Sequence, residues 1–223
     1  MGSDIPKQFL PLCGKPVLAH TLGLFQHHPR IDKIVLVVAE RYFSDCRRLA
    51  NEYGISKLHG LVVSGDSAQA SIYNGLKSVA AEFPADTMVL LHDGVRPYLD
   101  PKVIDSNIDA VERYGSAVTY TPCYETIVLS HDGAQVDSLP RRNDSYTAQA
   151  PQSFRLGDVL SAHERIRARP EGYENMVDQA TIFWTLGLPI HLVRGNRGNV
   201  KITTPEDIVM LEALLKWQGQ HIQ

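Results

Sequence analysis

Short, continuous apolar segments alternate with amphipathic segments along most of the chain. The apolar segments are KIVLVVA (33–39), GLVVS (60–64), TMVLLHD (87–93) and SAVTYTP (116–122). They are rich in Val, Leu and Ile and bounded by turn residues, as is typical of strands buried on both faces of a sheet. The segments with helical spacing of apolar residues are 16–28, 43–54, 67–83 and 101–115. This alternation predicts an α/β fold with a mostly parallel sheet and helices on both sides.

The alternation is interrupted between residues 124 and 154. TIVLS and QVDSL have a strand-like composition and flank Asp132-Gly133, a dipeptide typical of tight hairpin turns. A hairpin that is inserted into an α/β domain and carries little core of its own is typical of a protruding arm. We therefore predict an inserted β-arm over residues 124–150. Because its exposed strand edges need a cover, we also predict a second subunit that packs against it.

The α/β pattern resumes after the arm. The predicted elements are helices near 156–168 and 176–186, strands at IHLVRG and NVKI, and a final amphipathic helix, TPEDIVMLEALLKWQ, with Thr204 as its N-cap. No linker, repeat or low-complexity tract divides the sequence. We therefore predict a single domain over residues 1–223.

The composition is that of an ordinary soluble globular protein, with 43% hydrophobic and 21% charged residues. The formal net charge of −3 gives no reason to expect a nucleic-acid or anionic-membrane surface. No apolar segment reaches the roughly 18 residues that a membrane helix requires, and no signal peptide is recognisable. The three scattered cysteines form no CxxC pair, which argues against a disulfide framework or a structural zinc site. We expect a cytoplasmic protein.

Two motifs place candidate ligand-binding groups close to the start of a helix. PKQF holds Lys7 next to Pro6 just ahead of a helix, where its ammonium can reach a phosphate; the alternative is a solvated surface lysine. SGDSAQAS (64–71) follows a strand, so Gly65 allows a ligand close to the backbone and Asp66 can accept hydrogen bonds. The alternative there is an ordinary capped helix.

Two further motifs place charged residues at element ends. In HDGVRP, Asp93 and Arg96 directly follow the buried segment TMVLL, at the strand end where open α/β sheets bind ligands. Such a pair can orient hydroxyls, hold a metal or bind phosphate, or it can be a structural ion pair. Lys201 in NVKITTPEDI lies next to the N-terminus of the last helix, where a phosphate or a nearby aspartate would balance its charge.

Five motifs occur in one order along the chain: PKQFLPL, SGD, HDGVRP, AQAPQSF and NVKITTPEDI. This set resembles the sugar-alcohol-phosphate cytidylyltransferases, which include the 2-C-methyl-D-erythritol 4-phosphate and the ribitol-5-phosphate enzymes. The resemblance covers essentially the whole sequence. It implies a Rossmann-like nucleotidyltransferase fold, a homodimer joined through the arm, and Mg²⁺-dependent transfer of CMP from CTP to an alditol phosphate.

The resemblance also implies roles for the nucleotide-binding residues. Lys7 matches the lysine that stabilises charge on the triphosphate during attack, so it is a candidate catalytic residue. Gly65, Asp66 and Ser71 match the loop that recognises cytidine.

A second group matches residues that bind the acceptor. Asp93, Arg96, Thr126 and Lys201 match groups around the alditol phosphate, and Lys201 is also a candidate catalytic residue. Arg142 matches a residue that reaches from the arm across the dimer. Asp93 is in addition a candidate ligand of the divalent cation.

Some positions depart from the family pattern. The nucleotide loop has Ser67-Ala68 where an arginine is usual, and Ala150 and Val177 replace threonines that the erythritol enzymes favour. The segment LPRRNDSYTAQAPQSF is closer to the ribitol-phosphate branch. We therefore favour ribitol 5-phosphate over 2-C-methyl-D-erythritol 4-phosphate as the acceptor.

Family members carry a strand and a loop of the form A-G-G-x-G-x-R ahead of the segment that begins here with Met1-Gly2-Ser3. The corresponding first strand and glycine loop are missing from this sequence, so we hypothesise a start assigned to an internal methionine or a trimmed chain. Two alternatives to the cytidylyltransferase remain open: a catalytically impaired binding or scaffold subunit of the same fold, and a sugar-1-phosphate nucleotidyltransferase.

Overall fold

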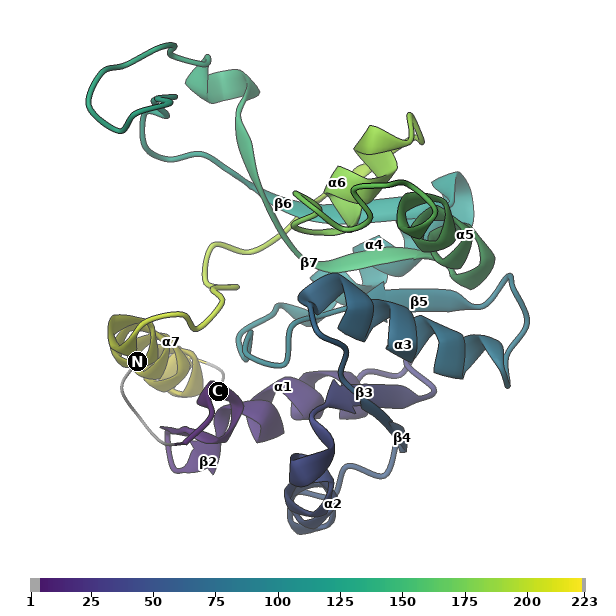
Figure 1. The fold of residues 1–223 in the computed structure, drawn as a ribbon. Helices are drawn as coiled ribbons and strands as arrows, with labels where there is room; N and C mark the ends of the chain where they lie inside the picture. Colours follow the sequence, from purple (N-terminus) through teal and green to yellow (C-terminus); the bar gives the residue numbers. More distant parts are fainter. Residues whose placement is uncertain (1–4, 222–223) are drawn as a thin grey trace.

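The computed structural model describes residues 5–221, in which helices cover the faces of the sheets (Figure 1). The strands are β1 (Pro11–Leu12), β2 (Lys15–Pro16), β3 (Ile34–Val38), β4 (Leu58–Val63), β5 (Met88–Leu91), β6 (Ser116–Pro122), β7 (Tyr146–Arg155) and β8 (Leu192–Arg194). The α-helices are α1 (Val17–Gln26), α2 (Phe43–Glu52), α3 (Ala68–Ala80), α4 (Pro101–Tyr114), α5 (Leu156–Arg167), α6 (Gln179–Thr185) and α7 (Pro205–His221). None of the helices within residues 5–221 combines the length and the apolar character that a membrane crossing requires.

Local sequence signals account for several helix ends. The hydroxyl of Ser67 accepts a hydrogen bond from the Ala70 amide and caps α3. Helix α4 has Asp100 as its N-cap and Pro101 in its first turn, and it ends at Gly115, which has a φ of 82°. The predicted alternation of strands and helices over residues 33–122 is therefore confirmed.

The sheets are mixed, and β7 is the strand that departs from the predicted parallel arrangement. Strands β3 and β4 pair in parallel, whereas the four-stranded sheet has the order β5-β7-β6-β8. Strand β7 runs antiparallel to both of its neighbours, whereas β5, β6 and β8 run in one direction, and β6 and β8 pair directly in parallel. The chain leaves β6 through the arm and returns directly beside it, which needs no crossover helix and produces an antiparallel pair.

Helices hold the two larger sheets next to each other, although β3 and β5 share no strand pairing among the described residues. On one face, a Cβ placed on Gly75 of α3 would lie 2.8 Å from a methyl group of Val37 in β3. Leu76 of the same helix belongs to the apolar cluster that contains Val89 of β5. On the other face, Ile34 of β3 and residues of β5 pack in one cluster around α1 and α4.

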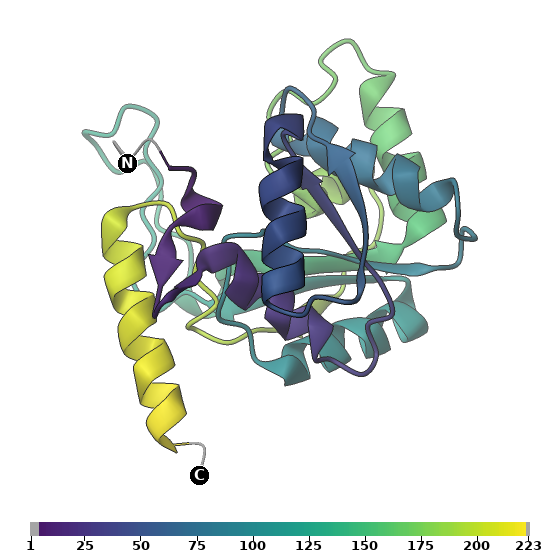
Figure 2. The same cartoon turned by 90° about the horizontal axis from the view of Figure 1, so that it is seen from below.

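The two ends of the described chain pack together. Leu12 and Val17 form one apolar cluster with Ile202 and Leu211, and all four side chains are fully buried. The short 3₁₀ helix η1 (Lys7–Phe9) consequently lies beside α7 (Figures 1 and 2). Apolar burial therefore brings the PKQF motif to the segment that carries the NVKITTPEDI motif.

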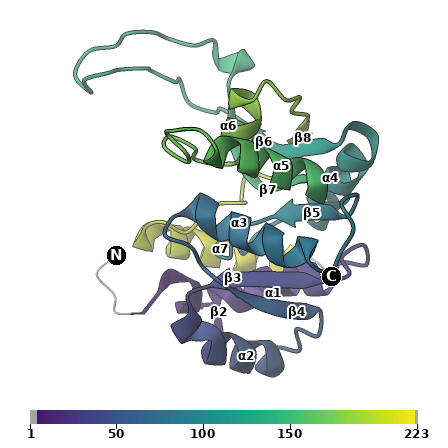
Figure 3. The same ribbon diagram turned by 45° about the vertical axis from the view of Figure 1, so that its right-hand side comes forward.

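The predicted arm projects away from the helical layers (Figure 3). The segment from Cys123 to Ser145 contains the 3₁₀ helix η3 (Arg142–Asp144) and one isolated bridge, between Leu129 and Ser138. The predicted strands at TIVLS and QVDSL are therefore wrong as regular strands, because neither has a ladder partner within the described chain. The exposed apolar side chains of the arm include Val128, Leu129, Val136 and Leu139.

Candidate active site

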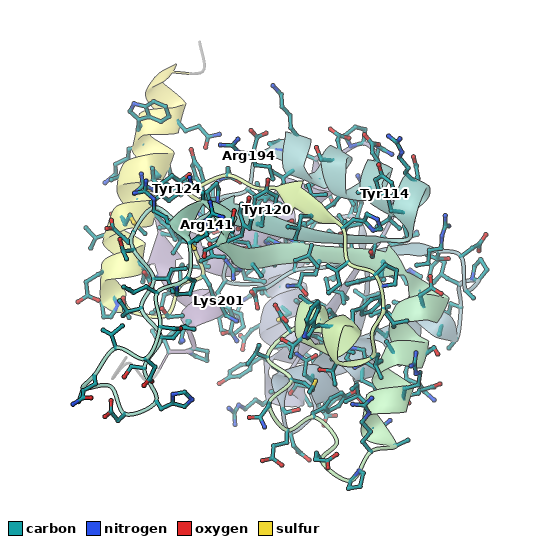
Figure 4. The ribbon with its side chains drawn as sticks, turned by 90° about the horizontal axis from the view of Figure 1, so that it is seen from above. Tyr114, Tyr120, Tyr124, Arg141, Arg194 and Lys201 are labelled. Carbon is teal, nitrogen blue, oxygen red and sulfur yellow. The ribbon has the colours of Figure 1, made fainter. Side chains whose placement is uncertain are left out.

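The candidate site centres on one aspartate that contacts two cations. Asp93 follows β5, and its Oδ2 accepts a hydrogen bond of 2.8 Å from Nε of Arg96. Its Oδ1 accepts a second, of 3.0 Å, from Nζ of Lys201, which lies 108 residues further along the chain. Figure 4 shows Lys201 between α7 and the strands β6 and β7. Three residues predicted separately from two motifs are thus brought together.

The two cations determine the charge state of Asp93. Burial alone raises the pKa of its carboxyl group, but the hydrogen bonds and charges of Arg96 and Lys201 outweigh burial and hold that pKa below the usual aspartate value of 3.8. Asp93 is therefore ionised at neutral pH. It keeps the two cations together in the absence of a phosphate.

We expect this charge cluster to make stability depend on pH. Because the pKa of Asp93 is lowered in the folded state, its ionised form stabilises the fold above the unfolded pKa, and this contribution is lost as pH falls through the folded pKa. Asp93→Asn should therefore lower the urea concentration at the unfolding midpoint near neutral pH. The difference in this midpoint between the variant and the wild type should become smaller at about pH 3. Asp86→Asn is the control, since Asp86 is exposed. A gap that is constant with pH would contradict the assignment.

His92 contacts the backbone of the loop that carries Asp93 and Arg96. Its Nε2 lies 3.1 Å from the backbone oxygen of Arg96, and its ring packs edge-on against Phe25. Burial lowers the pKa of His92 to about 4, so the ring is neutral at physiological pH. The contact with the Arg96 oxygen gives His92 a structural role at the end of β5.

Arg96 has another partner that the sequence analysis did not include. Its Nη1 donates a hydrogen bond of 2.9 Å to the backbone oxygen of Asn199, whose side chain is completely buried. The predicted strand at NVKI is wrong, because residues 199–202 pair with no strand within residues 5–221; instead the Ile202 amide bonds to the Val95 oxygen. Gly195 and Gly198, which both precede this asparagine in GNRGN, were the one available signal of an irregular, closely packed loop.

The predicted nucleotide loop connects β4 to α3. The Ser71 hydroxyl accepts a hydrogen bond of 3.0 Å from the Gly65 amide and donates one of 2.8 Å to the Ser67 oxygen. Asp66 is exposed. The loop thus has a fixed backbone and a carboxylate open to solvent, at the carboxyl end of a parallel strand.

Gly65 has no room for a side chain. A Cβ at this position would lie 2.6 Å from Cβ of Ala70 and 2.9 Å from its carbonyl carbon. We therefore expect Gly65→Ala to displace the loop and to raise the KM for CTP by about tenfold, with a lower melting temperature. Gly60→Ala in β4 is the matched control, because a Cβ there would meet nothing within 4 Å. Equal KM values for the two variants would count against a role of this loop in nucleotide binding.

None of the remaining candidates makes a hydrogen bond or ion pair with the Asp93 cluster among residues 5–221. Lys7 is exposed on η1, on the segment that packs beside α7. Thr126 and Arg142 are exposed on the arm, and neither makes a hydrogen bond or ion pair with the cluster among residues 5–221. Their roles in binding stay predictions, and the position of both on a projecting arm is compatible with a contribution to a second subunit.

A divalent cation held by the protein alone would need several ligating side chains in one place. Within residues 5–221 no three His, Cys, Asp or Glu side chains are grouped in a way that could hold a metal ion. Both carboxylate oxygens of Asp93 contact cations, and its role as a metal ligand stays a prediction. Mg²⁺ often binds chiefly to substrate phosphates and water. A Mg²⁺ ion bound mainly by substrate phosphates would not need such a group of side chains.

The fold and the charged loops at the ends of β4 and β5 define a nucleotidyltransferase of the Rossmann-like α/β class. The chain belongs to the family described as IspD, 2-C-methyl-D-erythritol 4-phosphate cytidylyltransferase, whose family model matches residues 1–217. It is 40% identical over 220 residues to the 2-C-methyl-D-erythritol 4-phosphate cytidylyltransferase of Syntrophotalea carbinolica, covering 98% of this chain and 92% of that protein. It is 38% identical over 217 residues to the ribitol-5-phosphate cytidylyltransferase of Vibrio parahaemolyticus, covering 97% and 90%.

Solved structures agree with this assignment. The 4-diphosphocytidyl-2C-methyl-D-erythritol synthase of Anaerococcus prevotii superposes with a TM-score of 0.84 at 27% identity and covers 96% of this chain and 92% of its own. The 2-C-methyl-D-erythritol 4-phosphate cytidylyltransferase of Thermus thermophilus superposes with a TM-score of 0.76 at 28% identity, covering 95% and 94%. The predicted family and fold class are confirmed.

Proposed function

We propose that this protein is a CTP-dependent cytidylyltransferase that transfers CMP from CTP to the phosphate of an alditol phosphate and releases pyrophosphate. The observation that carries the proposal is the pair of cations that Asp93 holds at the end of β5. Two cations on one carboxylate form a site that can exchange part of its internal contacts for a phosphate. The family membership supplies the reaction class.

In this proposal an oxygen of the acceptor phosphate attacks the α-phosphorus of CTP. The bond from that phosphorus to the bridging oxygen breaks, and pyrophosphate leaves with the electron pair. Arg96 and Lys201 hold the acceptor phosphate, while Lys7 offsets the charge that develops on the triphosphate. Gly65, Asp66 and Ser71 bind the cytidine. The protein thus contributes mainly position and charge, which supply most of the acceleration in such transfers.

The acceptor hydroxyls are proposed to contact Asp93 and Thr126, with Arg142 contributed from the arm of a second subunit. Mg²⁺ bound to the triphosphate would supply additional positive charge at the leaving group. We favour ribitol 5-phosphate as the acceptor, because Ala150 and Val177 lack the hydroxyls of the threonines that the erythritol enzymes favour. We expect the reaction to take place in the cytoplasm, consistent with free thiols at all three cysteines.

Pyrophosphate release tests the function. The purified protein should release pyrophosphate from CTP and Mg²⁺ only when an alditol phosphate is present, and EDTA should abolish the release. In competition, ribitol 5-phosphate should be consumed faster than 2-C-methyl-D-erythritol 4-phosphate. Binding of CTP without turnover would favour the impaired binding or scaffold subunit. Turnover with UTP and a sugar 1-phosphate would favour the rival nucleotidyltransferase.

We propose that the arm joins two copies of the chain, because its exposed apolar side chains need a cover. Leu139 is 63% exposed, and Leu139→Glu should weaken the dimer at least about tenfold, shifting sedimentation velocity profiles toward the monomer. Val209→Glu is the matched control, since Val209 is an exposed apolar residue that belongs to α7 and not to the arm. A wild-type protein that sediments as a monomer would contradict the proposal.

A further inference from the structure

Asn199 connects the base of the arm to the cation pair. Its Nδ2 donates hydrogen bonds to the backbone oxygen of Ala150, at 2.5 Å, and to Oε1 of Gln149, at 3.3 Å. Both acceptors belong to β7, the strand by which the arm returns to the sheet. The backbone oxygen of the same asparagine accepts the hydrogen bond from Arg96. One buried residue therefore contacts both the arm strand and the arginine proposed to bind phosphate.

The side chain of Asn199 is only partly satisfied. Its Oδ1 is buried and has no hydrogen-bond partner, although the side chain is completely inaccessible to solvent. The orientation of the amide follows from its partners, because both groups that Nδ2 contacts are oxygens. A buried acceptor without a partner is unfavourable, so packing stability alone does not explain an asparagine here.

A second buried asparagine provides the comparison. Asn107 in α4 is equally inaccessible, but its Nδ2 donates to Val103 and Thr119 and its Oδ1 accepts from Ser153. Asn107 thus uses both ends of its amide in the core. Asn199 uses only the donor end of its amide, and this end fixes the backbone segment that leads to Lys201.

We propose that Asn199 is a positioning residue for the acceptor phosphate. It fixes two groups relative to the base of the arm: the backbone oxygen that orients Arg96, and the start of the backbone segment that leads to Lys201. This inference rests on the proposed function, in which Arg96 and Lys201 bind that phosphate. Without the amide, residues 196–201 lose their anchor on β7. The guanidinium then loses its fixed acceptor, while the CTP loop after β4 keeps all of its own contacts.

Steady-state kinetics of two variants test the proposal. Asn199→Ala should raise the KM for the alditol phosphate about tenfold and leave the KM for CTP within about twofold. Gln149→Met removes one acceptor of the amide without removing volume, and it should raise the same KM by a smaller factor. This milder variant keeps the test available if Asn199→Ala folds poorly. Asn107→Ala is the control: it should lower the melting temperature without a selective change in either KM.

A double-mutant cycle with Arg96→Ala separates positioning from general destabilisation. If Asn199 acts through Arg96, adding Asn199→Ala to Arg96→Ala should change the KM for the alditol phosphate much less than it does in the wild type. Additive effects, or equal increases in both KM values, would overturn the inference. A wild type that shows no turnover would instead overturn the proposed function. If Arg96→Ala raises the KM for the alditol phosphate and the Asn199 variants do not, only the positioning role of Asn199 is overturned.

Discussion

Lys7→Ala is expected to lower kcat for CMP transfer by about 10²–10³-fold, with little change in the KM for the alditol phosphate. The α-phosphorus gains an additional negatively charged ligand in the transition state, so a cation placed there stabilises the transition state more than bound CTP. Lys7 is exposed on η1 and available to a triphosphate. Stopped assays of pyrophosphate release at saturating CTP measure the change directly.

Lys15→Ala is the control for this prediction. Lys15 is an exposed lysine in β2, further along the same N-terminal segment. If the fall in kcat came from the change in net charge or from loosening of this segment, Lys7→Ala and Lys15→Ala would lower kcat by the same factor. A fall in kcat of less than about threefold for Lys7→Ala would remove Lys7 from the catalytic residues.

Lys201→Ala should lower kcat/KM for the alditol phosphate by about 10²-fold, mainly through KM. The phosphate would lose one of its two proposed cations, and Asp93 would keep only Arg96 as a partner. The carboxylate would then repel the incoming phosphate more strongly than in the wild type. Initial rates at varied alditol phosphate and saturating CTP give the comparison.

Lys102→Ala is the matched control, because Lys102 is exposed in the first turn of α4. Raising the salt concentration should weaken alditol phosphate binding in the wild type and in this control, but less in Lys201→Ala. An unchanged KM in Lys201→Ala would mean that its contact with Asp93 is a structural ion pair, which is the alternative that the sequence left open.

The sequence predicted most elements because their signals are local. The strand expected at 33–39 is observed as Ile34–Val38, and the helix expected at 101–115 as Pro101–Tyr114, since apolar spacing, Pro101 and Gly115 act within a few residues. Strand direction has no such local signal. The apolar pattern of β7 is compatible with either direction, and the antiparallel pairing follows from the path of the arm.

The candidate site was predicted in separate parts. Asp93 and Arg96 share one motif, but their contact with Lys201 depends on the packing of Leu12 and Ile202, which join the two ends of the chain. Asn199 was missed because the shorter hydrogen bond of its side chain goes to a backbone oxygen, that of Ala150, which any sequence supplies.

Phosphorus NMR of one reaction mixture tests the central claim most directly. The protein is incubated with CTP, Mg²⁺ and equal amounts of ribitol 5-phosphate and 2-C-methyl-D-erythritol 4-phosphate. We predict that the CTP signals are replaced by those of pyrophosphate and a CDP-alditol diester. The ribitol product should appear first. Lys7→Ala should form both products much more slowly than the wild type. CTP that persists unchanged, or that is hydrolysed to CMP without a diester, would contradict it.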